Sequence, residues 1–160
     1  MFLRAIFFAA IILFGSAAMA GEGRLSRSFP VRSDIQTVAD WLNSHHDEVA
    51  RSTHCRIISR RGNLVRVARN TMKGEFEFTL RETITEGKDS GTYRMDLVES
   101  HKGRLTHERT VVTFTKSGSG TSISIYAEAV VDDPRIRNPA VIAGLSTSVR
   151  GFERMMLSRF

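Results

Sequence analysis

Two glutamates, Glu82 and Glu99, have the residue type and the position that chemistry inside a protein cavity needs. Each follows a segment in which apolar and polar side chains alternate, and each has the parity of the apolar ones. These apolar residues are Phe76, Phe78 and Leu80 before Glu82, and Tyr93, Met95 and Leu97 before Glu99. Because side chains two residues apart on a strand share a face, both carboxylates are expected to point inward. An enclosed carboxylate is costly unless it is paired, so both are candidates for ligand orientation or general acid–base chemistry. In the alternative interpretation, both glutamates lie at strand ends that open to water.

Cys55 is the single cysteine of the chain and stands at the start of a strand-like segment. A lone cysteine in this context is typically a small buried hydrophobic residue. A nucleophilic role would need an activating base, and the neighbouring His54 would point to the opposite face of a strand. An intermolecular disulfide is the remaining alternative.

The histidines do not form a convincing metal site. His45 and His46 are adjacent on a predicted helix, where consecutive side chains diverge by about 100°. His101 and His107 could meet across a turn, although surface histidines explain this spacing equally well. The chain has no G-x-S-x-G nucleophile motif and no glycine-rich phosphate loop between a strand and a helix. The catalytic residues are therefore unknown, and neither a metal nor a cofactor is expected.

The first twenty residues have the three-part plan of a secretory signal peptide. Arg4 supplies the positive charge, residues 5–14 form an apolar run, and Ala18 and Ala20 precede the expected cleavage site. The run is too short for a hydrocarbon core, which needs roughly twenty residues. We expect an exported protein, periplasmic or extracellular, in which residues 21–160 form a single domain. An uncleaved membrane anchor is the alternative.

Residue periodicity predicts an α+β domain. A strand over residues 24–31 precedes a helical layer over 35–52, which breaks near residues 43–44 and begins with Ser33 and Gln36 as a capping box. Period-two patterns then predict strands over 55–60, 64–69, 76–84, 93–97, 106–116 and 122–131. Short polar turns join these strands, and such strands pair antiparallel because parallel pairs need long crossovers.

A long helix is predicted from Asn138 to Phe160, with Asn138 as its N-cap and Pro139 in the first helical position. Its apolar stripe consists of Ile142, Leu145, Val149, Phe152, Met156 and Phe160. Gly144 and Gly151 interrupt the helix, each at a cost of up to about 1 kcal/mol relative to alanine. Either close packing of the helix backbone on a sheet or room for a ligand beside the helix would account for them.

The chain carries a formal net charge of +6. This charge is compatible with anionic lipid surfaces, acidic ligands or nucleic acid. Five basic residues lie close together in the sequence, and we interpret them as a solvated sheet face. They are Arg56, Arg60, Arg61, Arg66 and Arg69. The aromatic residues share parity with aliphatic ones, as core residues do, so no nucleic-acid partner is expected. Peripheral contact with an anionic membrane surface stays open.

The order of these elements resembles the START-like superfamily, which includes Bet v 1-like, polyketide cyclase and lipid-transfer proteins. The segments that carry the resemblance are residues 29–34, 76–82, 93–99 and 138–160. The resemblance implies a helix-grip fold, in which an antiparallel sheet of about six to seven strands bends around the C-terminal helix and encloses an elongated cavity. Cystatin-like and NTF2-like folds could carry similar patterns. No position matches a catalytic motif of the superfamily.

Most members of this superfamily bind hydrophobic ligands, and a minority catalyse reactions in the cavity. The resemblance therefore implies non-catalytic binding or carriage of a hydrophobic or amphipathic small molecule, such as a lipid. The residues expected around this ligand are Phe76, Phe78, Glu82, Tyr93, Met95, Glu99, Leu145, Phe152 and Met156. Two alternatives remain: a cavity enzyme of cyclase or hydrolase type, and an interaction domain whose core is full.

Overall fold

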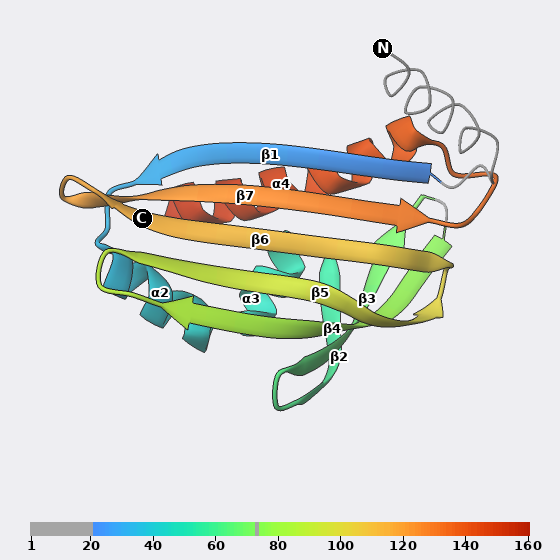
Figure 1. Cartoon of the computed structure of the whole chain (residues 1–160), viewed down its shortest axis with the longest axis horizontal. Helices are drawn as coiled ribbons and strands as arrows, with labels where there is room; N and C mark the ends of the chain where they lie inside the picture. The colour runs from blue at the N-terminus through green and yellow to red at the C-terminus, as the bar shows by residue number, and fades with distance from the viewer. Residues whose placement is uncertain (1–20, 73) are drawn as a thin grey trace, which may run out of the picture.

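A computed structural model describes residues 21–72 and 74–160 (Figure 1). The predicted signal peptide lies outside the described residues. The elements are β1 (Gly21–Val31), α2 (Ile35–Ser44), α3 (His46–Ser52), β2 (Cys55–Arg61), β3 (Leu64–Thr71), β4 (Gly74–Glu86), β5 (Ser90–Lys102), β6 (Leu105–Ser117), β7 (Gly120–Val131) and α4 (Asn138–Arg159). In this part of the chain, no helix is both long enough and apolar enough to cross a membrane.

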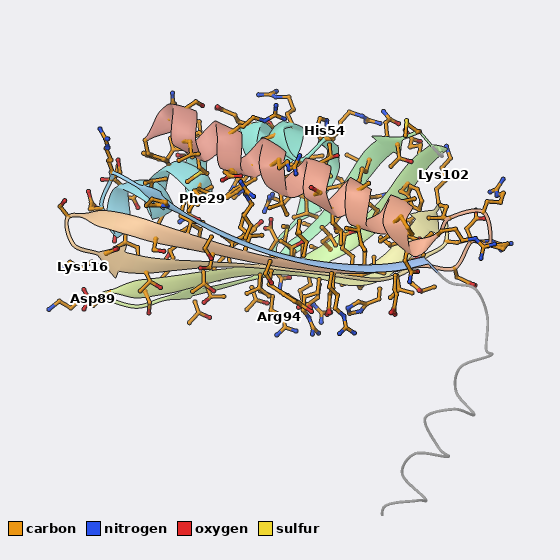
Figure 2. The ribbon with its side chains drawn as sticks, turned by 90° about the horizontal axis from the view of Figure 1, so that it is seen from above. Phe29, His54, Asp89, Arg94, Lys102 and Lys116 are labelled. Carbon is orange, nitrogen blue, oxygen red and sulfur yellow. The ribbon has the colours of Figure 1, made fainter. Side chains whose placement is uncertain are left out.

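The seven strands form one antiparallel sheet in the order β1-β7-β6-β5-β4-β3-β2. Helix α4 and the pair α2–α3 lie on the same side of this sheet, as Figure 2 shows from above. Helix α4 begins beside the start of β1, where the side-chain oxygen of Asn138 accepts a hydrogen bond from the backbone N–H of Glu22 at 2.9 Å. The predicted α+β helix-grip architecture is confirmed.

Alternation of side chains between the two faces creates the core. On β7, the inward residues are buried and apolar apart from one threonine; they are Thr121, Ile123, Ile125, Ala127, Ala129 and Val131. Strand β4 contributes Phe76, Phe78 and Leu80 to the same core, and α4 contributes Leu145, Phe152 and Met156. The period of two that predicted these strands therefore follows from one face being packed under helices.

Both predicted helix starts are displaced by one residue. The N-cap of α2 is Asp34 rather than Ser33, and its carboxylate accepts a hydrogen bond from the backbone N–H of Thr37 at 3.0 Å. The N-cap of α4 is Arg137, so Asn138 is the first helical residue and its side chain instead bonds to β1. The predicted break near residues 43–44 is confirmed, because α2 ends at Ser44 and α3 begins at His46.

The two glycines of α4 have different surroundings. A Cβ atom on Gly151 would lie 1.9 Å from the carbonyl oxygen of Ser52, the last residue of α3. The hydroxyl of Ser148, one turn earlier, donates to the carbonyl oxygen of Thr53 at 3.1 Å. The close packing expected at Gly151 therefore exists, but against the end of α3 and not against the sheet. Gly144 is exposed, and a Cβ atom there would have open space around it.

We expect opposite effects from alanine at these two positions. Gly144→Ala should raise the free energy of unfolding by roughly 0.5–1 kcal/mol, because alanine has less conformational freedom to lose in a helix. Gly151→Ala should lower it by about 1–3 kcal/mol, because the methyl group would force α4 away from Ser52. Urea unfolding of both variants measures the two changes. Similar shifts in the same direction would contradict the packing role of Gly151.

The face of the sheet opposite the helices carries a network of charged side chains, and Arg94 points into solvent on this side (Figure 2). At its centre, Glu128 accepts a hydrogen bond from the hydroxyl of Tyr126 at 2.5 Å, and the Nε2 atom of His107 lies 2.9 Å from its other oxygen. The hydrogen bond from Tyr126, followed by that from His107, lowers the pKa of Glu128 below its ordinary value.

This lowered pKa makes the contribution of Glu128 to stability dependent on pH. The contribution is present above the pKa of an unfolded glutamate, about 4.3, and is lost as the pH falls through the lower folded value. Glu128→Gln should therefore lower the melting temperature at pH 7, and this effect should shrink progressively as the pH falls below about 4. Thermal unfolding across this range provides the measurement, with Glu22→Gln as an exposed control. An effect of Glu128→Gln that stays constant with pH would contradict the assignment.

Candidate functional site

A cavity of about 170 Å³ lies between the helices and the inner face of the sheet. Its wall is mostly apolar, with Val65, Val67, Leu80, Ile125 and Phe152 among the residues that line it. Residues of α2 and of the turn between β4 and β5 complete the lining. We call this end, around Gln36, Asn43, Glu86 and Ser90, the rim.

Five of the nine residues predicted around a ligand line this cavity: Glu82, Tyr93, Met95, Leu145 and Phe152. Phe76, Phe78 and Met156 are buried in the surrounding core and lie outside the lining. Phe78 is fully buried, with the guanidinium carbon of Arg69 5.3 Å from the centre of its ring. The structure thus brings five of the nine predicted residues to one cavity, and contact with a ligand stays a prediction.

Glu99 lies apart from the cavity, with 66% of its side chain exposed. The register of β4 with β5 pairs Leu80 with Leu97 and Thr79 with Glu99, which leaves Val98 as a bulge. Because a bulge inserts one extra residue, side chains after Val98 exchange faces relative to those before it. The inward direction expected for Glu99 from simple alternation is therefore wrong. Glu82 does point inward, because the extra residue of the bulge lies on β5 and the side chains of β4 alternate regularly as far as Glu82.

Glu82 is held by two neighbours from different strands. Its carboxylate accepts two hydrogen bonds from the guanidinium of Arg60, one of them at 3.2 Å, and a further one from the hydroxyl of Tyr93. Burial, followed by the hydrogen bond to Glu82, raises the pKa of Tyr93 well above its ordinary value. Tyr93 is therefore a neutral hydrogen-bond donor. Arg60 is the more accessible partner, with 31% of its side chain exposed.

A second ion pair joins Arg69 on β3 to Glu108 on β6. The two terminal nitrogens of Arg69 donate to the two carboxylate oxygens of Glu108 at 3.0 and 3.2 Å. Only 4% of the Glu108 side chain is exposed. Burial acts against the charge of Arg69, but the attraction of Glu108 and Cys55, together with the hydrogen bonds to both, outweighs it and raises the pKa of the guanidinium. The pair is thus a fixed ion pair in the cavity wall.

Cys55 lies beside this second pair. Its sulfur is 3.3 Å from the Nε atom of Arg69, which donates to it, and 3.7 Å from the carbonyl oxygen of Thr53. The residue is buried and lines the cavity, and its thiol is free. His54 lies in the connection between α3 and β2, where its backbone has a positive φ of 61°.

Four charged residues of the cavity were not predicted as site residues: Arg60, Arg69, Glu108 and, at the rim, Glu86. Arg69 shares parity with Val65 and Val67, and Glu108 shares parity with Val112 and Phe114, so alternation could have identified both. Arg60 could not have been found in this way, because a shift in the register of β2 between Ile57 and Ser59 turns it inward. The interpretation of the arginine cluster as a solvated face is therefore wrong for Arg69, whereas Arg60 is exposed although its guanidinium contacts Glu82.

The site can bind an apolar molecule and offer it hydrogen bonds at two places. Among the described residues, no three histidine, cysteine, aspartate or glutamate side chains gather closely enough to hold a metal ion. The polar groups of the wall include the carboxylates, the guanidinium groups and the Tyr93 hydroxyl. Such a cavity combines apolar contact area with a few fixed polar groups, as small-molecule sites do.

Comparison with known proteins adds information on the fold. No protein-family model matches the chain, and no curated protein matches its sequence. A START superfamily protein from Mycobacterium smegmatis superposes with a TM-score of 0.64 and 12% identity, over 85% of this chain and 95% of that one. A STAR-related lipid transfer protein from Xanthomonas axonopodis gives a TM-score of 0.61 and 10% identity, over 83% and 85%.

An enzyme has the same fold. The Zhui aromatase/cyclase from Streptomyces sp. R1128 superposes with a TM-score of 0.57 and 12% identity, over 86% of this chain and 90% of that one. The chain therefore has the START/Bet v 1-like fold. The resemblance predicted from the order of the elements is confirmed. Because this fold serves both ligand binding and catalysis, the function has to be argued from the site.

We expect the protein to lose stability when only one partner of the Arg69–Glu108 pair is removed. Glu108→Ala should lower the free energy of unfolding by about 3–5 kcal/mol, because it leaves a buried guanidinium uncompensated. The double variant Arg69→Met with Glu108→Leu should recover most of this loss, since it leaves no buried charge. Urea unfolding of the single and double variants tests this coupling. A double variant that is less stable than the single one would contradict it.

Proposed function

We propose that this protein is an exported carrier that binds a hydrophobic or amphipathic small molecule, such as a lipid, without converting it. The observation that carries the proposal is the mostly apolar cavity of about 170 Å³ beneath α4. Apolar walls supply affinity through the area they remove from water, and a few polar groups orient the ligand. Tyr93, Met95, Leu145 and Phe152 are the proposed apolar contacts, and Glu82 is a proposed polar one.

Export is proposed from the signal-peptide pattern of residues 1–20. The positive net charge of the chain would favour approach to anionic membrane surfaces, where an amphipathic ligand could be collected or delivered. The lipid transfer protein of the same fold supports carriage as the first candidate.

Catalysis in the cavity is the second candidate, and the arrangement of Glu82 favours it. A carboxylate that contacts both a tyrosine hydroxyl and a guanidinium could position a reacting carbonyl or hydroxyl group. The cyclase of the same fold is the precedent. If this candidate is right, Glu82→Gln would abolish conversion of a ligand that the protein still binds.

Native mass spectrometry of the protein, expressed from its full sequence and purified gently, tests carriage. We expect a stoichiometric small-molecule adduct that Ala127→Phe removes, because Ala127 lines the cavity and a phenyl ring there would fill it. Ala143→Phe is the matched control, because Ala143 is exposed on α4. Circular dichroism shows whether both variants fold. An adduct that survives Ala127→Phe in a folded protein would place the ligand elsewhere.

A further inference from the structure

A row of mostly charged side chains crosses the outer face of the sheet, which is the face opposite the helices (Figure 2). Residues that stand opposite each other on paired strands share a face of the sheet. In strand register the row consists of Arg24, Glu128, Arg109, Asp96, Arg81, Leu64 and Arg61. It therefore reaches from the edge strand β1 to the other edge strand, β2.

The arginines of this row differ in whether a carboxylate pairs with them. Arg109 donates a hydrogen bond to Asp96 at 2.8 Å, and Arg94 donates two more to the same carboxylate. Arg81 stands opposite Asp96 in register. No carboxylate in the described part of the chain, however, forms an ion pair with Arg81 or with Arg61. These two guanidinium groups, at the β2 end of the row, are therefore available to a ligand.

Protection of the sheet edge explains only one of these two arginines. Charged side chains on an edge strand discourage pairing with other chains, and Arg61 lies on the edge strand β2. Arg81 lies on β4, which is hydrogen-bonded to β3 on one side and to β5 on the other. Its unpaired charge in the interior of the sheet therefore requires another explanation.

Leu64 separates the two unpaired arginines. Opposed residues on antiparallel strands have Cα atoms about 5 Å apart, so the Cα atoms of Arg61 and Arg81 lie roughly 10 Å apart across Leu64. Both arginine side chains are exposed, whereas Leu64 is half-buried. Two long side chains placed in this way can direct their guanidinium groups toward one ligand above an apolar floor.

A phosphate monoester suits two guanidinium groups better than a carboxylate does. It carries a charge of about −1.5 to −2 at pH 7 and has three strong acceptor oxygens. An arginine binds phosphate through two parallel N–H···O hydrogen bonds. One monoester can therefore neutralise both Arg61 and Arg81, whereas a single carboxylate leaves one positive charge uncompensated.

We propose that Arg61 and Arg81 form a binding site for a phosphate monoester group on the outer face of the sheet, with Leu64 as its floor. The group comes either from a soluble phosphate compound or from the head group of a lipid such as phosphatidic acid. None of the three residues lines the cavity. The site is therefore separate from the cavity, and the proposal does not depend on carriage of a ligand there.

The first experiment uses inorganic phosphate, which presents the same terminal oxygens as a monoester. Sodium phosphate is titrated into the ¹⁵N-labelled protein at constant ionic strength, and ¹H–¹⁵N NMR follows the N–H signals. We expect saturable shifts at Arg61, Leu64 and Arg81 that are absent from the double variant Arg61→Gln with Arg81→Gln. Sodium acetate is the control ligand, and an equal response to acetate would overturn the assignment to phosphate.

The second experiment measures sedimentation of the protein with phosphatidylcholine vesicles that contain about one fifth phosphatidic acid. Each arginine near an anionic membrane surface contributes roughly fivefold to binding, so the same double variant should bind at least about tenfold more weakly. The matched control is Arg150→Gln with Arg154→Gln, which removes the same charge from exposed positions on α4, on the other side of the sheet. We expect this control to keep most of the binding.

The two experiments distinguish the sources of the phosphate group. Vesicle binding that depends on Arg61 and Arg81, without a response to inorganic phosphate, would assign the site to a lipid head group. A response to inorganic phosphate alone would assign it to a soluble compound. No response in either experiment, or equal losses in the two double variants, would overturn the proposal. Circular dichroism checks folding, and the single variant Arg61→Gln replaces a double variant that does not fold.

Discussion

Pairing between arginine and glutamate across the sheet is the interaction on which the interior of this protein depends. Isolated, neither Arg69 nor Glu108 could occupy a wall made largely of valine, leucine, isoleucine and phenylalanine side chains. Joined by two hydrogen bonds, they connect β3 to β6 over the concave face of the sheet. The apolar volume beneath α4 therefore has a fixed polar group in its wall whose two charges are paired with each other.

The cavity also depends on close backbone contacts that keep helix α4 in position. Gly151 allows the helix to touch the end of α3, and Ser148 adds a hydrogen bond to Thr53 at the same place. At the other end of the helix, Asn138 bonds to the backbone of β1. These contacts fix the helix where it packs on β1, while Leu145, Val149 and Phe152 reach the cavity from the same helix.

Sequence periodicity predicted the strands and helices because each of them has one packed face. It also placed Glu82 inward, since the side chains of β4 alternate without a break from Phe76 to Glu82 and the bulged residue lies on β5. It failed at Glu99 because the bulge at Val98 reverses the faces, and at Arg60 because the register of β2 shifts before it. The partnership of Arg69 and Glu108 joins residues 39 positions apart in the sequence, on strands that are three apart in the sheet. A local pattern holds no information on such a contact.

The anchoring of α4 has a further consequence for how molecules of different size would be distinguished. Because contacts between protein groups hold both ends of the helix, enlarging the cavity would require breaking them. The part of a longer ligand that exceeds the cavity would therefore stay in water beyond the rim. Discrimination by length would then depend on the hydration of the protruding part, while discrimination by width would depend on steric fit between the helix and the sheet.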